Sequence, residues 1–575
     1  MKQNIFVKRL TSLQQRNRKN SNAINNDLYK LLWKQEALMA GYDRIKKQMK
    51  TTTAPIDIGS FYDFSQAKMS RLSNVLQNES WKPRAAKQFY NGKPSDGKVQ
   101  KSFVPSWAKG GKSGLRKGVL QIPAQIQGLE ELIVQSTMLL ILEAIYESVW
   151  SKTSFGFIPG KGCHDALKTI DQNYNAMQYT IEGNIQGMYD KVNHHTLVNL
   201  MKKKIQDGRF IRLTYKMLRA GYMEGSTTVI KPVIGTPQGS IVSPILANIY
   251  LHEFDTFMTK RSKDVQKYKD KVEITLPQNL FNNTSQTVAK KMLDQNLSRQ
   301  QKHQYTKKNK SLKFQDVKGT SLTNRNTVIN YIRYADDFII GVTGGLQYTS
   351  NLKSDIQSVL ETLGLTLNQN ETKITNLVKD NAYFLGHHIR INTCVQQAYD
   401  KKKGLFLKQI TARRININAP NNLIVQRLAV KGFCDYKGFP HHKKRWTTQE
   451  DSVIIQNFNA IIRGLFGFYS GVHNPAYLGR IWYILKFSCA KTLAARHNSS
   501  LKKIFTKHGP KLKVHYGQTG QKSIELYQPS LKVKNRKWQV GRQMDDPYVT
   551  MDTQTAKLDL LDNCSIYDTP TVKTL

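Results

Sequence analysis

A polar tetrapeptide, Tyr334–Asp337, stands between two apolar runs, residues 328–332 and 338–342. Runs of this length, rich in β-branched and aromatic residues, predict two strands, and the short polar segment between them predicts a hairpin turn. Such a turn holds Asp336 and Asp337 at the hairpin tip, where carboxylate oxygens can reach Mg²⁺, a cation that prefers oxygen ligands. Since Asp is also common in turns for its local hydrogen bonds, an ordinary solvated turn is the alternative.

The charge of the chain indicates a polyanionic partner. Its 575 residues contain 87 Lys and Arg against 41 Asp and Glu, a formal net charge of +46. Charge of this size favours nucleic acid, and the 26 Tyr and 22 Phe residues suit stacking on bases. An anionic membrane surface is less favoured, because we find no apolar run near the 18 residues that span a bilayer. We expect no membrane partner.

Cysteine and histidine patterns do not indicate a zinc site. The five cysteines are scattered without a Cys-x-x-Cys pair, so we expect reduced core residues. The pairs His194-His195 and His441-His442 would point apart in either regular structure, and we expect them to be structural or RNA-facing. The first 26 residues contain no acid and six Lys or Arg, which is typical of a mitochondrial presequence or of a flexible basic arm that binds RNA.

Three further segments accompany the predicted hairpin. Residues 156–164 are rich in glycine and open a predicted helix, where backbone amides and Lys161 suit a phosphate, although such a stretch is often only a turn. A strand is predicted from Tyr179 to Asp190, and residues 235–240 precede another apolar helix. In this combination and order, the four segments resemble the reverse transcriptase of group II intron maturases. The resemblance runs from about residue 28 to 510.

The resemblance implies that the second strand supplies an Asp that binds Mg²⁺ together with Asp336, but this chain has Asn184 there. An amide oxygen brings no charge. One unit charge at about 4 Å is worth roughly 4 kcal/mol at an effective dielectric constant near 20, or about a thousandfold in rate. We therefore expect weak or absent polymerisation. Glu182, two residues back, is a nearer substitute than Asp190, which would lie about 20 Å along a strand.

The resemblance also implies a nucleotide-binding site that takes a dNTP only if the polymerase is active. Its tyrosine would close off the nucleotide 2′ position, and a loop would contact the incoming nucleotide and template. Two departures weaken the polymerase interpretation: residues 115–119 break the usual Arg-Pro-Leu-Gly-Ile run, and Glu371 stands where the family usually has lysine. The implied nucleotide-binding residues are Arg116, Tyr189, Gln238, Gly239 and Lys373.

Beyond residue 421, apolar residues recur at helical spacing, as in the stripe from Ile454 to Tyr469. This part resembles the thumb-like domain X with which maturases hold intron RNA. Arg480 and Lys491 are eleven residues apart and would share a helical face; a solvated helix face is the alternative. No Cys-containing endonuclease is visible after this part. The candidate RNA-binding residues are Lys161, Arg463, Arg480, Lys491, Lys502 and Lys503.

The expected fold is α+β: right-hand polymerase fingers and palm with an antiparallel palm sheet, followed by an all-helical thumb or domain X. The expected parts are a basic N-terminal arm or presequence (1–26), an N-terminal extension and start of the fingers (27–123), fingers and palm (124–400, with a polar insertion at 260–325), thumb or domain X (401–515) and a polar tail (516–575).

Three functions fit this sequence. The first is a maturase that binds its host group II intron RNA and assists splicing, with a reverse transcriptase domain impaired at Asn184. The second is an active RNA-directed DNA polymerase that supports retrohoming and also contacts a DNA target; the third is a decayed reading frame. Enzyme activity and a homodimer are left open. The resemblance is closer to mitochondrial members of the family, including the insertion before the hairpin, and this favours the mitochondrion, with the plastid as the alternative.

Overall fold

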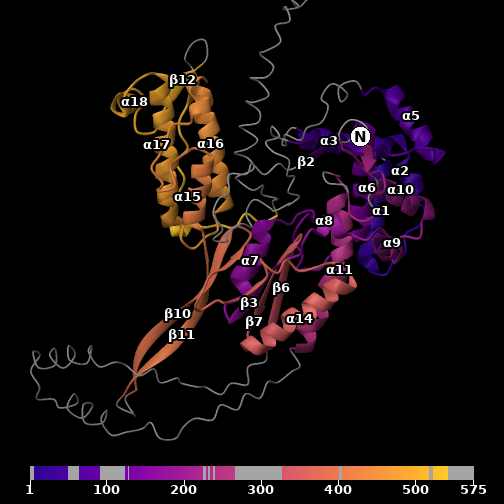
Figure 1. Ribbon diagram of the computed structural model, residues 1–575, viewed down its shortest axis with the longest axis horizontal. Coiled ribbons are helices and arrows are strands. Elements are labelled where there is room, and N and C mark those ends of the chain that lie inside the picture. Colours follow the sequence, from indigo (N-terminus) through magenta and orange to yellow (C-terminus); the bar gives the residue numbers. More distant parts are fainter. Residues whose placement is uncertain are drawn as a thin grey trace, which may run out of the picture.

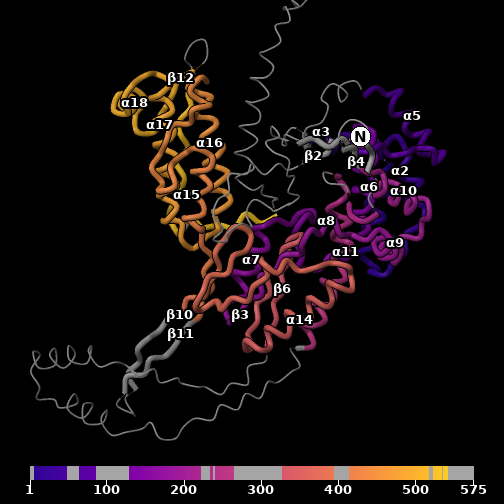
Figure 2. The backbone as a smooth tube through the Cα atoms, in the orientation of Figure 1, coloured from indigo at the N-terminus to yellow at the C-terminus, as the bar shows by residue number. Residues whose placement is uncertain are grey.

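The computed structural model describes residues 5–49, 64–90, 123–126, 128–224, 228–230, 233–236, 240–265, 327–400, 405–516 and 522–541. A mixed α/β region carries the predicted hairpin, and a helical region stands apart from it, with a long two-stranded ribbon at the junction (Figures 1 and 2). The mixed α+β class with antiparallel sheets is confirmed. Within the described residues, no helix combines the length and the apolar character that crossing a bilayer requires.

The N-terminal helices surround one apolar helix, α6 (Leu129–Tyr146), which is buried along most of its length. Its neighbours include α1 (Ile5–Lys19), α2 (Leu28–Leu32) and α3 (Gln35–Met49), and α5 (Gln66–Gln77) packs against α3. Helix α1 is packed, since its Phe6 is buried and its Arg18 pairs with Glu147 at the C-terminus of α6. The basic character of residues 5–19 is thus carried on a packed helix.

The central sheet contains the predicted hairpin. Its strand order is β6 (Ile329–Tyr334), β7 (Asp337–Val342), β3 (Tyr179–Asn184) and β8 (Lys373–Asn376), and all neighbours are antiparallel. Period-two alternation divides the side chains between two cores: one core contains α11 (Ser243–Val265) and α14 (Leu346–Thr362), and the other contains α7 (Cys163–Asn173) and the C-terminal helices. The hairpin tip therefore sits between two packed layers.

The second predicted strand is shorter than expected. It ends at Asn184, and Asp190 lies instead in the short helix α8 (Met188–Lys191), which follows Gly187 in the left-handed region at φ +56°. The chain continues into α9 (His194–Lys202) and α10 (Gly208–Leu218). A smaller sheet has the order β2 (Pro123–Ile126), β1 (Ala86–Tyr90), β4 (Tyr222–Glu224) and β5 (Thr228–Ile230), with β1 and β4 parallel.

The C-terminal region begins with a long antiparallel ribbon. After β9 (Ala382–Phe384), strands β10 (His387–Asp400) and β11 (Leu405–Asn418) pair along nearly their whole length and project from the body (Figure 1). The helices α15 (Asn421–Val430), α16 (Asp451–Phe468), α17 (Gly479–Arg496) and α18 (Leu501–His508) follow. The predicted stripe from Ile454 to Tyr469 is confirmed as buried, but β12 (Val514–Tyr516) and β13 (Lys522–Ile524) show that this region is not all-helical.

The segment after β13 does not extend away as a tail. It returns to helix α7, where the guanidinium of Arg536 pairs with Asp171. The backbone N–H of Gln539 donates to His164 Nδ1 at 2.9 Å. These contacts join the helical region to the central sheet. Residues 542–575 and residues 266–325 of the expected insertion (260–325) lie outside the described residues, whereas residues 260–265 belong to the end of α11.

Candidate functional site

The hairpin tip is a two-residue turn. Tyr334 pairs with Asp337, so Ala335 and Asp336 form the turn, and Ala335 adopts the left-handed conformation at φ +56°. The Ile185 N–H donates to the Asp336 carbonyl at 3.0 Å, which fastens the turn to the chain just beyond β3. The predicted hairpin is confirmed, and its two carboxylates lie where β3 ends.

A close backbone contact explains the glycine at the start of the 156–164 segment. A Cβ on Gly156 would lie 2.4 Å from the Ala335 nitrogen, and the Phe155 N–H donates to the Arg333 carbonyl at 3.0 Å. The Lys161 ammonium donates to the carbonyls of Ser151 and Ser154 at 3.1 and 2.8 Å. In this structure, that lysine therefore holds the loop that braces the hairpin, and its contact with RNA stays a prediction.

A buried ion pair supports the hairpin from α11. Arg333 donates from Nε and Nη2 to the two Asp255 oxygens at 2.8 and 2.6 Å, and both side chains are fully buried. Tyr331 donates to the same carboxylate at 2.7 Å, and Arg333 Nη1 also reaches the Ala335 carbonyl at 3.0 Å. Because the ion pair is bidentate and excluded from water, it fixes the orientation of the turn as well as its position. Sequence reasoning missed this support, since the two residues are 78 positions apart.

The residue that departs from the family pattern contacts the site directly. Asn184 stands opposite Asp337 in the sheet register, and its Nδ2 donates to Asp337 Oδ1 at 2.8 Å. Asp337 Oδ2 is buried and makes no hydrogen bond in the described structure. Burial raises the pKa of Asp337 well above its usual range, and the Asp336 carboxylate adds to this. The asparagine thus supplies a donor where the family pattern places a third charge.

Electrostatics at the turn favour a cation. Burial, reinforced by Glu371, raises the pKa of Asp336 to about 6, although hydrogen bonding from its own backbone and from Asn184 opposes the shift. Within the described ranges, no three His, Cys, Asp or Glu side chains are arranged to hold a metal ion. A buried carboxylate with an unpaired oxygen beside a second carboxylate fits one divalent cation. Two carboxylates hold it less firmly than three would.

The nearest other carboxylate is already engaged. Glu182 Oε2 accepts from the Tyr383 N–H at 2.7 Å and lies 3.4 Å from the Lys373 ammonium, and Oε1 accepts from the Thr375 hydroxyl. These contacts make Glu182 a link between β3, β8 and β9 rather than a replacement at Asn184. Lys373, one of the implied nucleotide-binding residues, lies opposite Glu182 in the pairing of β3 with β8, and 57% of its side chain is exposed.

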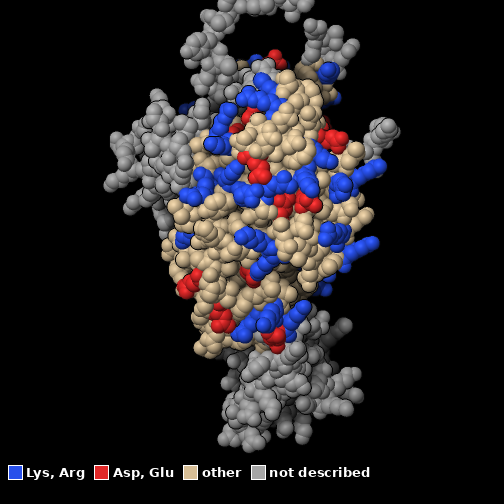
Figure 3. All heavy atoms as spheres, turned by 90° about the vertical axis from the view of Figure 1, so that its right-hand side faces the viewer, with Lys and Arg blue, Asp and Glu red and all other residues tan. Residues whose placement is uncertain are grey.

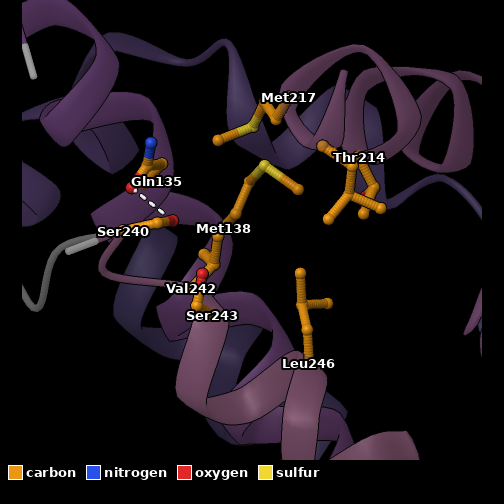
Figure 4. A pocket seen from close by; sticks show the side chains of 9 residues that line it. Gln135, Met138, Thr214, Met217, Ser240, Val242, Ser243 and Leu246 are labelled. Carbon is orange, nitrogen blue, oxygen red and sulfur yellow. Dashed lines mark hydrogen bonds between the residues drawn. The ribbon is translucent and has the colours of Figure 1, made fainter. Parts of the chain in front are cut away.

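Tyr189 lies close to the hairpin and supports the next loop. Burial, followed by the charge of Asp336, raises its pKa. Its carbonyl accepts from the Thr236 N–H at 2.7 Å. At the far end of this loop, Gln135 Oε1 accepts from the Ser240 hydroxyl and the Ile241 N–H, both at 2.9 Å (Figure 4). Sequence reasoning missed Gln135, a polar residue inside an apolar helix; Arg116, Gln238 and Gly239 lie outside the described residues.

The five candidate RNA-binding residues of the C-terminal region fall into two groups. Lys502 and Lys503 are exposed in the first turn of α18. Arg480 donates to the Lys437 carbonyl at 2.6 Å, Lys491 donates to the Pro440 carbonyl at 2.8 Å, and Arg463 lies over the Tyr527 ring. The second group is therefore occupied with intramolecular contacts.

The remaining cationic side chains are spread over the surface. Figure 3 shows Lys and Arg across the face that carries the N-terminal helices, with fewer acidic side chains between them. Three cysteines, Cys163, Cys434 and Cys489, are buried without disulfides, as expected for core residues. His194 Nε2 donates a hydrogen bond to the Gly235 carbonyl at 2.6 Å, a structural contact.

Comparisons with known proteins match two segments of the chain to two protein families. Residues 129–315 match the family described as reverse transcriptase (RNA-dependent DNA polymerase), and residues 412–550 match the type II intron maturase family. The chain is 29% identical over 505 residues to the putative COX1/OXI3 intron 1 protein of Saccharomyces cerevisiae, covering 86% of this chain and 56% of that protein. The group II intron-encoded protein LtrA of Lactococcus lactis is 28% identical over 505 residues, covering 86% of this chain and 78% of LtrA.

A third relative is matched over almost the whole chain. It is the uncharacterized 91 kDa protein in the cob intron of Schizosaccharomyces pombe, 29% identical over 540 residues, which covers 92% of this chain and 62% of the relative. The chain thus spans little more than half the length of its yeast relatives.

Proposed function

This chain belongs to the family of group II intron-encoded reverse transcriptases and maturases, and from that premise we propose that it is a splicing maturase whose polymerase site is impaired. It binds the RNA of its host intron and stabilises the folded form while the RNA carries out its own catalysis. In this proposal the central sheet is the palm, the helices before it contribute the fingers, and α15–α18 form the thumb or domain X.

The observation that carries the impairment is the contact between Asn184 and Asp337. At a position where the family pattern has a carboxylate, an amide donates a hydrogen bond to one of the two carboxylates that remain. Asp336 and Asp337 are the residues that would hold Mg²⁺, which when bound neutralises charge on the transferred phosphate. The missing unit charge, at about 4 Å, costs roughly 4 kcal/mol of that stabilisation.

RNA binding rests on charge and on the C-terminal region. The net charge of +46 gives a strong attraction for phosphates, so affinity should fall steeply with salt. Lys502 and Lys503 are exposed at the start of α18 and are free to approach a phosphate backbone. Specificity then comes from the shape and exposed loops of one structured RNA.

The alternative function is an active RNA-directed DNA polymerase that supports retrohoming and contacts a DNA target. The intact support of the hairpin favours it: the Arg333–Asp255 pair and the close approach of Gly156 preserve the backbone of the site. A decayed reading frame is less favoured, because clusters of buried apolar side chains pack on both sides of the sheet.

We place the protein in the mitochondrion, with the plastid as the alternative. An uncharacterized mitochondrial protein of Marchantia polymorpha, ymf11, is 25% identical over 425 residues. The bacterial LtrA matches as well as the yeast relatives do, so this proposal rests on the combination of relatives and composition.

The test uses the purified full chain in two parallel assays: primer extension on an oligonucleotide-annealed RNA template in Mg²⁺, and splicing of the host intron at low Mg²⁺. Splicing stimulation without extension supports the maturase. Extension at the rate of an intact family member would contradict the impairment and establish the alternative. As a control, Asp336→Ala should keep full affinity for the intron RNA, since Asp336 serves the metal; a large loss would contradict that separation.

A further inference from the structure

A tight loop connects α15 to α16 and presents two aromatic side chains. In residues 435–439, the Asp435 N–H donates to the Phe439 carbonyl at 2.9 Å, and the Asp435 carboxylate accepts from the Phe439 N–H at 2.8 Å. Gly438, at φ +89°, closes the turn, and Cys434 pairs with Pro440 in a single bridge. The loop is therefore a closed, internally bonded turn, and its outward side chains are Tyr436 and Phe439, which are 61% and 64% exposed.

Two cationic side chains of α17, Arg480 and Lys491, hydrogen-bond to the backbone of this loop. Arg480 donates to the Lys437 carbonyl at 2.6 Å, and Lys491, three turns along the same helix face, donates to the Pro440 carbonyl at 2.8 Å. The Ser488 hydroxyl donates to the next carbonyl, that of His441, at 2.6 Å. Three side chains of one helix thus fix the loop, so the exposure of its two rings is set by the fold.

Two more exposed aromatic side chains flank the arginine that holds the loop. Tyr477 precedes α17 and is 69% exposed, while Tyr483 lies one turn after Arg480 and is 51% exposed. The Tyr483 ring packs on Phe487 with centroids 4.5 Å apart, which orders it. Among the described residues, only six Phe or Tyr side chains are this exposed, and four of them lie here; the others are Phe157 and Tyr527. We call Tyr436, Phe439, Tyr477 and Tyr483 the aromatic platform.

The surroundings of the platform are basic. Residues 421–450 contain six Lys or Arg and two acids, and Lys437, Lys444 and Arg445 are exposed. Protein–protein interfaces deplete lysine at their apolar centre, whereas single-stranded nucleic acid is bound by cations that follow the backbone and rings that stack on bases. Charge and composition together favour RNA over a protein partner.

We propose that the aromatic platform stacks on unpaired bases of the intron RNA. Arg480 and Lys491 act as positioning residues that hold the loop, and the exposed cations around it contact phosphates. The inference rests on the proposed maturase function and adds to it the kind of RNA that domain X recognises. That RNA is single-stranded, with bases splayed out in loops or junctions, because paired bases offer no free face for stacking.

The experiment compares side chains that differ in stacking. The double variants Tyr436→Leu/Phe439→Leu and Tyr436→Trp/Phe439→Trp both keep an apolar surface, but only the second keeps aromatic rings. Affinity is measured by filter binding of the full-length protein to the host intron RNA, to a single-stranded oligonucleotide and to a fully paired duplex, across a salt series. A Lys502→Gln/Lys503→Gln variant is the matched phosphate-contact control.

The leucine variant should bind the intron RNA and the single strand roughly 10- to 100-fold more weakly, because stacking contributes about 1–3 kcal/mol per base. Duplex affinity and the salt slope should not change, and the tryptophan variant should bind like the unaltered protein. The lysine control should instead reduce the salt slope.

If the leucine variant bound all three RNAs as tightly as the unaltered protein does, or lost affinity equally for single strand and duplex, the platform would be overturned. Absence of intron-RNA binding by the unaltered protein would instead overturn the proposed function itself. The four rings are exposed, so the variants should fold normally, which far-UV circular dichroism verifies.

Discussion

The hairpin tip and the aromatic platform are both small turns held by neighbouring helices, but they use charge in opposite ways. At the hairpin, two carboxylates are buried or half-buried beside an asparagine, and one carboxylate oxygen makes no hydrogen bond in the described structure. At the platform, the cations of α17 are hydrogen-bonded to loop carbonyls and the rings stand in solvent. Both turns are thus fixed by side chains of neighbouring elements, but one places its charged groups in the interior and the other leaves its rings exposed.

The largest effect is expected from breaking the support of the hairpin. Arg333→Met leaves Asp255 as a buried charge without its bidentate partner, which should lower the free energy of unfolding by about 3–5 kcal/mol. Chemical denaturation followed by circular dichroism measures the change. A loss of this size would show that the buried ion pair contributes to the stability of the hairpin and of the sheet that carries it.

The matched control uses an ion pair made by α11, the helix that also carries Asp255. Arg261 pairs with Asp355 at 2.8 Å, but both side chains are more than a third exposed. Arg261→Met should therefore cost less than about 1 kcal/mol, because an exposed ion pair contributes little. Equal losses in the two variants would contradict the conclusion that the buried pair supports the turn.

The second-largest effect is expected from restoring the carboxylate that the family pattern has at position 184. Asn184→Asp places a carboxylate opposite Asp337, which should lower stability in chelator and raise it with Mg²⁺. If the remaining parts of the site are intact, primer extension should rise by up to about a thousandfold, equivalent to roughly 4 kcal/mol. Thermal unfolding with EDTA or Mg²⁺ and a primer-extension assay measure both.

Asn184→Ser is the control, since it removes the amide without adding charge. It should gain neither Mg²⁺-dependent stability nor extension. Metal-dependent stabilisation without extension in the aspartate variant would place further damage elsewhere, at Arg116 or Glu371.

Sequence reasoning identified the parts of the site that depend on local pattern. The hairpin, the existence of the second strand and the buried helical stripe of α16 follow from periodicity and turn composition, although the pattern predicts that this strand reaches Asp190, whereas it ends at Asn184. It did not identify Gln135 or the Arg333–Asp255 pair, because contacts between residues far apart in sequence leave no local signal. It also proposed Arg480 and Lys491 as RNA-binding residues, which stays a prediction; it did not foresee their hydrogen bonds to loop carbonyls, which depend on how that loop folds back on α17.

A third, smaller effect concerns the close contact at the turn. Gly156→Ala would place a methyl group 2.4 Å from the Ala335 nitrogen, and the backbone must shift to accommodate it. Overpacking of this kind should cost about 1–3 kcal/mol and displace Asp336. Gly345→Ala is the control, since a Cβ there meets nothing within 4 Å and its φ of −71° suits any residue. Denaturation midpoints compare the two; similar stability would show that the hairpin is loosely held.

The smallest effect concerns the junction between the two regions, where His387 is fully buried against Phe468 and Trp538. Burial lowers its pKa to about 3. Because the unfolded chain takes up this proton near pH 6.5, the stabilisation is complete above that pH and is lost progressively as the pH falls towards 3. Asp336 acts in the opposite direction: its raised pKa gives stability below about pH 4 that is lost as the pH rises through 6.

His387→Phe isolates the junction, because a phenyl ring fits among these aromatic neighbours and does not titrate. Between pH 7 and 6 the unaltered protein should lose about 0.7 kcal/mol more stability than the variant. Parallel urea titrations at the two pH values measure this difference, and the contribution of Asp336 cancels because both proteins contain it. Identical pH slopes would mean that His387 takes up its proton over the same pH range in the folded and unfolded states, which would contradict its burial at the junction.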